Sequence, residues 1–77
     1  MPGILERNKL KVLQLTPRQK QCVDLLARGY SPKEIATILY IEPRTVNYHL
    51  YCVLQRFEAK TYPQLIYYLA ELDYFKE

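Results

Sequence analysis

One helix-start motif occurs three times in this chain of 77 residues and divides it into helical segments. Each copy has a Ser or Thr, a Pro one or two positions later, and a Gln or Glu three positions after the hydroxyl residue; the copies lie at residues 16–19, 31–34 and 61–64. The hydroxyl caps the first turn, the Gln or Glu side chain caps the backbone N–H of the hydroxyl residue, and Pro suits a helix start. Pro43 marks one further start, so the sequence predicts an all-α fold of four helices.

Apolar residues follow each start at helical spacing. We expect the first helix to reach Arg28, where Gly29 supplies the left-handed residue that ends it, and the last helix to reach about Asp73 or Tyr74. In the first, second and fourth helices, the side chains expected to face the core are Cys22, Val23 and Leu26, then Ile35, Ala36 and Leu39, then Leu65, Leu69 and Leu72.

The third helix, expected from Pro43 to Phe57, has two opposite faces. Its apolar stripe consists of Val46, Leu50, Val53 and Phe57, and its outer face of Arg44, Tyr48, Tyr51 and Gln55. A solvated face usually mixes Lys with Glu, whereas this outer face has no carboxylate, so we interpret it as a contact surface. Only residues 40–42 separate this helix from the preceding one, which predicts the sharp crossing of a helix-turn-helix. From its outer face, we interpret the third helix as one that enters DNA.

Residues 1–15 fit neither the helical nor the strand period cleanly. The alternation at residues 10–12 indicates an extended arm, while residues 4–13 could form a short helix. We therefore expect residues 1–15 to be a leader packed on the domain or the end of a linker from an upstream domain, with the domain itself at residues 16–77.

The composition is that of a globular chain, with 49% apolar and 25% charged residues. The net charge of +3 is uneven: residues 1–33 carry seven basic and two acidic side chains, which is compatible with a polyanionic partner. No signal peptide or apolar run of membrane-spanning length is present in the sequence, so we expect a cytoplasmic protein with no membrane partner.

Sequence motifs for catalysis or metal binding are lacking. Cys22 and Cys52 have no CxxC spacing and are interpreted as reduced core residues, and His49 has no carboxylate neighbour at helical spacing. A phosphate-binding Gly-rich loop and a recognisable nucleophile–base pair are also missing from the sequence. We expect a protein that is no enzyme and needs no cofactor.

The last helix is apolar on nearly all sides. Beyond its core stripe it carries Ile66, Tyr67, Ala70 and Tyr74, which a domain of this size has no further segment to cover. We interpret these four residues as a partner surface, and a symmetric homodimer is the simplest partner.

Several short motifs together resemble the LuxR-type (GerE-type) DNA-binding domain of bacterial transcription regulators. They are LTPRQ at residues 15–19, LLARG at 25–29, SPKEIA at 31–36, Ile41, and TVNYH at 45–49. The resemblance covers about residues 15–75. It implies a four-helix (tetrahelical) fold in which the second and third helices form the DNA-binding unit, the third lies in the major groove, and the fourth makes dimer contacts. For activators it also implies contact with RNA polymerase.

The resemblance places Asn47, Tyr48 and Tyr51 against the bases, and Thr45, His49 and Arg56 against phosphate. Helical geometry adds Arg44, which lies near the start of the third helix and can reach a base or a phosphate. Ser31 and Lys33 stand at the start of the second helix, where free amides and the helix dipole favour phosphate.

Five positions depart from the family pattern and keep other interpretations open. Asn47 and Tyr51 stand where family members often have Lys, Tyr62 where a basic residue is common, Cys52 where Asn is common, and Glu42 where a Ser or Thr cap is usual. One alternative is a helix-turn-helix scaffold that binds another protein, with reduced or lost DNA binding. Another is a domain like the fourth region of a sigma factor, although His49 and the helix after Thr61 favour the LuxR type.

Overall fold

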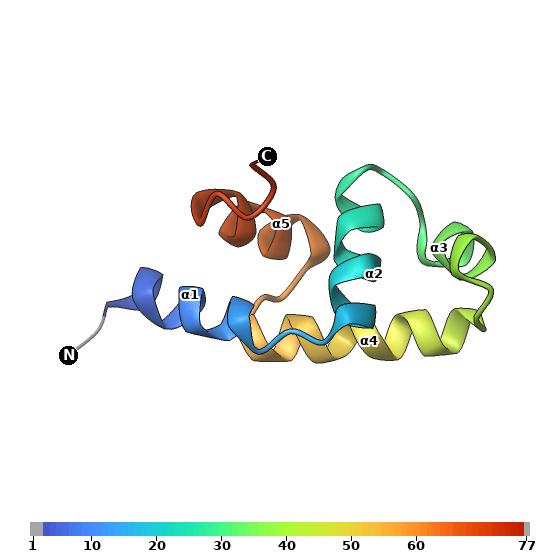
Figure 1. The fold of residues 1–77 in the computed structure, drawn as a ribbon, viewed down its shortest axis with the longest axis horizontal. Helices are drawn as coiled ribbons and strands as arrows, with labels where there is room; N and C mark the ends of the chain where they lie inside the picture. Colours follow the sequence, from blue (N-terminus) through green and yellow to red (C-terminus); the bar gives the residue numbers. More distant parts are fainter. Residues whose placement is uncertain (1–2, 77) are drawn as a thin grey trace.

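The computed structural model describes residues 3–76 as five helices without a strand in that range (Figure 1). They are α1 (Ile4–Leu13), α2 (Pro17–Ala27), α3 (Pro32–Leu39), α4 (Pro43–Phe57) and α5 (Tyr62–Glu71). The predicted all-α fold is confirmed, and α2–α5 are its four predicted helices. Residues 4–13, for which the sequence allowed either an extended arm or a short helix, form the helix α1.

The predicted caps form at three helix starts. Thr16 and Gln19 exchange two hydrogen bonds of 3.0 and 3.1 Å, and Ser31 and Glu34 exchange two of 2.9 and 3.2 Å. At α5, Thr61 accepts from the Gln64 N–H, but the Gln64 side chain accepts from the N–H of Lys60, one residue before the cap. The third capping box is therefore incomplete, because its return bond is made one position earlier.

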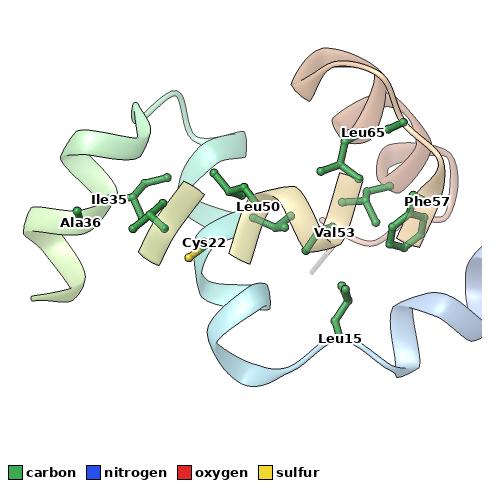
Figure 2. Close-up of a cluster of buried hydrophobic side chains, with 12 residues drawn as sticks. Leu15, Cys22, Ile35, Ala36, Leu50, Val53, Phe57 and Leu65 are labelled. Atoms are coloured by element: carbon green, nitrogen blue, oxygen red, sulfur yellow. The ribbon is translucent and has the colours of Figure 1, made fainter. Parts of the chain in front are cut away.

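The long helix α4 organises the molecule. Figure 1 shows α2, α3 and α5 on one side of it, with α1 beside its C-terminal end. Its predicted stripe is confirmed as buried: Val46, Leu50 and Val53 have no exposed surface, and Phe57 has 3%. Figure 2 shows this stripe meeting Ile35 of α3 and Leu65 of α5. Burying each such side chain contributes on the order of 2 kcal/mol, so α4 supplies much of the stabilisation of a small core.

The N-terminal helix is joined to this core. Leu15 is 5% exposed and belongs to the central cluster, and Val12 packs against that cluster. Asn8 of α1 is also buried. Val12 and Leu15 therefore join the N-terminal segment to the core.

The C-terminal end differs from the prediction. α5 ends at Glu71, two or three residues earlier than expected, and Asp73 adopts a left-handed conformation with φ of 57°. The N–H of Tyr74 then donates to the Leu69 carbonyl oxygen at 3.1 Å. The chain therefore reverses after α5, and Tyr74 leaves the helical face on which the sequence placed it. None of the described helices is long and apolar enough to cross a membrane.

Candidate nucleic-acid interface

α3 and α4 form a helix-turn-helix whose turn is closed by a left-handed residue at the end of α3. Tyr40 is left-handed, with φ of 59°, and the N–H of Ile41 donates to the Ala36 carbonyl oxygen at 3.0 Å. Non-glycine residues adopt this conformation at a cost, so the packing of α3 against α4 must hold the turn in place. Ile35 and Ala36 supply that packing from α3.

The outer face of α4 is open to solvent. Tyr48 is 65% and Tyr51 57% exposed, and Arg44, Asn47 and Gln55 are also exposed. α4 contributes no carboxylate between Pro43 and Phe57. The four residues predicted to contact bases thus share one accessible face of a fifteen-residue helix.

One flank of α4 is half-buried. It carries Thr45, His49, Cys52 and Arg56, which recur at helical spacing. A side-chain hydrogen bond to Cys52 raises the pKa of the Tyr48 hydroxyl, and the charge interaction with Cys52 acts in the same direction. The His49 ring lies 6.2 Å from the Tyr48 ring, centroid to centroid. The predicted phosphate contacts Thr45, His49 and Arg56 therefore border the predicted base contacts.

Arg56 has a partner that sequence reasoning missed. Its Nη1 donates to the Oε1 of Gln14 at 2.6 Å. Gln14 follows α1 directly, 42 residues away along the chain. Gln14 and Arg56 belong to no common sequence motif, so the sequence did not indicate this contact.

Arg44 lies beside an acidic residue. Its Nε is 3.0 Å from Oε2 of Glu42, and both side chains are largely exposed. Exposed pairs of this kind contribute between zero and about 1 kcal/mol, so Arg44 can exchange Glu42 for another acceptor. As expected, Glu42 makes no side-chain cap bond to α4.

The start of α3 combines Ser31 and Lys33 with a capping carboxylate. Hydrogen bonds to the backbone and then the side chain of Ser31 lower the pKa of Glu34. Ser31 thus serves as a cap, while Lys33 is exposed beside it. The negative charge of Glu34, which the capping box holds at the start of α3, opposes the helix-dipole attraction for phosphate.

The four residues predicted as a dimer surface are split by the structure. Tyr67 is 61% exposed and Ala70 is exposed, whereas Ile66 and Tyr74 are partly buried against the core. A largely apolar depression of about 460 Å³ lies where α2 meets α5. Its lining comprises Leu26, Ala27, Tyr62, Pro63, Ile66, Tyr67 and Ala70. Tyr74 instead lines a neighbouring depression with Asp24 of α2 and Arg28, which follows α2 directly.

Both cysteines are free, Cys22 buried and Cys52 half-buried. Burial raises the pKa of the Cys22 thiol, although the positive charge of Arg18 acts against it. Across the described residues, His, Cys, Asp and Glu side chains form no group of three or more that could hold a metal ion.

Comparison with known proteins decides the family. The luxR family of bacterial regulatory proteins matches residues 13–69. This chain belongs to that family. The LuxR-family domain is 35% identical over 54 residues to the oxygen regulatory protein NreC of Staphylococcus carnosus, and 36% identical over 53 residues to the tetrathionate response regulatory protein TtrR of Salmonella typhimurium.

These matches cover 70% and 69% of this chain but only 25% and 26% of the two relatives, so the chain spans about a quarter of the length of the curated proteins it matches. No solved structure shows a significant match. Family membership and the two regulatory relatives support DNA-binding transcription regulation.

Proposed function

We propose that this LuxR-family domain binds duplex DNA sequence-specifically and regulates transcription, with α4 lying in the major groove. The observation that carries the proposal is the exposed face of α4, which is polar, aromatic and free of α4 carboxylates, on a helix whose opposite face is fully buried. Such a face can be presented to base edges without a change in the fold.

Each exposed side chain has a task in this arrangement. Asn47 can pair with adenine through two hydrogen bonds, and Tyr48 and Tyr51 can contact a thymine methyl group or a base edge. Arg44 reaches a base near the start of α4, released from Glu42. Ser31, Lys33, Thr45, His49 and Arg56 contact phosphates and set the register of the helix in the groove.

The active species is a homodimer that associates through α5. Exposed Tyr67 and Ala70 and the depression between α2 and α5 support this surface. Two α4 helices related by a dyad would read half-sites about one helical turn apart. For an activator, the resemblance to LuxR-type regulators also implies contact with RNA polymerase.

A salt titration with random-sequence duplex DNA, followed by fluorescence anisotropy, tests the proposal. Lys33 and Arg56 supply two cationic contacts per protomer, so the logarithm of the binding constant of a dimer should fall with the logarithm of salt concentration at a slope of about −4. Binding that is undetectable at low salt, or independent of salt, would overturn DNA binding.

The second candidate is a helix-turn-helix scaffold that binds a protein partner. Glu42 favours it, because its exposed carboxylate lies 3.0 Å from Arg44 at the end of α4 that should enter the groove, where it would repel phosphate. Replacement of Glu42 by Ser separates the two functions. A DNA-binding domain should bind random duplex more tightly after the change, whereas a protein-binding scaffold should still show no salt-dependent DNA binding.

A further inference from the structure

We infer that Gln14 is a positioning residue for DNA binding: it holds the Arg56 side chain in the orientation that contacts a phosphate. This inference rests on the proposed function. The contact that motivates it is the 2.6 Å hydrogen bond from Arg56 Nη1 to Gln14 Oε1, which joins the end of α1 to the C-terminal half of α4.

The backbone of Gln14 is held in place by local hydrogen bonds, and its side chain is exposed. Its N–H donates to the Lys11 carbonyl oxygen at 3.1 Å, and the next residue, Leu15, donates to the Val12 carbonyl oxygen at 3.2 Å and is buried in the core. The side-chain amide of Gln14 is therefore attached to a backbone position that is fixed next to α4. An acceptor attached to a fixed backbone restricts the flexible side chain that donates to it.

The chemistry of the contact leaves Arg56 available for DNA. A guanidinium has five N–H donors, so one bond to Gln14 leaves donors for a phosphate. Gln14 is neutral and leaves the positive charge uncompensated, and within residues 3–76 no carboxylate forms an ion pair with Arg56. Restricting this side chain before binding lowers the entropy cost of the phosphate contact. A carboxylate at position 14 would compete with that phosphate instead.

Affinity measurements on Gln14→Ala and Arg56→Ala test the inference by a double-mutant cycle on random duplex DNA. Arg56→Ala should make the salt slope shallower by about 0.9 per protomer. Gln14→Ala should weaken binding about 2- to 10-fold, the range expected when one side chain must be ordered on binding, and it should have no effect when Arg56 is already Ala. Equal losses in the two backgrounds, or wild-type affinity for Gln14→Ala, would overturn the role.

Gln14→Glu provides a second variant that keeps the side-chain length. It should make the salt slope shallower by about 0.9 per protomer, as Arg56→Ala does, because the new carboxylate neutralises Arg56. Gln21→Glu, at an exposed position on α2, is the control for added negative charge and should leave the slope unchanged. Equal slopes for the two Glu variants would refute the assignment. Wild-type protein without salt-dependent binding would instead refute the proposed function, and urea midpoints identify any variant that has lost its fold.

Discussion

Individual side chains on α4 range from a buried stripe, through a half-buried flank, to an accessible outer face. Val46, Leu50 and Val53 are fully buried, while Tyr48 and Tyr51 are more than half exposed within the same fifteen-residue helix. Exposed tyrosines combine an apolar ring with a polar hydroxyl, which suits a surface that must contact both thymine methyl groups and hydrogen-bonding base edges.

At the residue scale, Tyr48 and Lys33 should have different effects when truncated. Tyr48→Ala should relax the choice at one base position, costing about 1–3 kcal/mol for the preferred base only. Lys33→Ala should weaken all sequences about equally and make the salt slope shallower by about 0.9 per protomer. Binding to a selected-sequence library, read by sequencing, measures both effects.

Lys60→Ala is the matched control for Lys33→Ala, because it removes an equally exposed Lys from the connection between α4 and α5. It should leave specificity and affinity unchanged. The assignment of base and phosphate contacts would be reversed if Lys33→Ala altered sequence preference and Tyr48→Ala did not.

Helix ends decide how the elements fit together. The reversal after α5 brings Tyr74 back toward α2, where it is partly buried near Asp24. Burial raises the pKa of Tyr74 to about 12, and the negative charge of Asp24 and a hydrogen bond to it act in the same direction. The folded state therefore favours the neutral hydroxyl, which ties the C-terminal turn to α2.

This tie predicts a loss of stability at high pH. The folded pKa of Tyr74 is about 12 against an ordinary value of 10.0, so its contribution is fully present below pH 10 and is lost as pH rises from about 10 to 12. Allowing for partial exposure, the loss should be on the order of 1 kcal/mol. The free energy of unfolding of Tyr74→Phe, measured with urea, should fall less than that of the wild type between pH 10 and 12. Tyr40→Phe, at a 95% exposed position, should decline as wild type does; an identical decline in all three proteins would contradict the tie.

At the scale of the whole molecule, α5 leaves an apolar surface exposed next to α2. α5 buries Leu65 and Leu69 against α4 but leaves Tyr67 exposed beside the depression between α2 and α5. Because the chain reverses after α5, Tyr74 does not lie on this face. The proposed dimer surface therefore consists of Tyr67, Ala70 and the exposed part of Ile66. A second copy of the chain would cover this apolar area.

At this scale, Tyr67→Glu should shift the protein toward monomer in sedimentation velocity. A charge buried in an apolar interface without a partner is destabilising, so the dissociation constant should rise at least about tenfold. Tyr40→Glu places the same charge at an exposed tyrosine in the α3–α4 turn and should not change the sedimentation profile. An unchanged profile for Tyr67→Glu would exclude this face as the dimer surface.

The sequence by itself determined the starts of α2–α5 and the two faces of α4. Caps such as Thr16–Gln19 and Ser31–Glu34 act within one helical turn, and the stripe from Val46 to Phe57 follows from the helical period. These features depend on residues close together in the chain, so spacing was sufficient to predict them.

Only the tertiary structure decided the features that join distant segments. The helical form of α1, the Gln14–Arg56 hydrogen bond and the return of Tyr74 to α2 each depend on where two separated parts of the chain meet. Their local patterns allowed more than one conformation, as residues 4–13 illustrate. Packing against the core then stabilised one of these conformations. The residues that pack together are far apart along the chain, so sequence spacing did not predict their contacts.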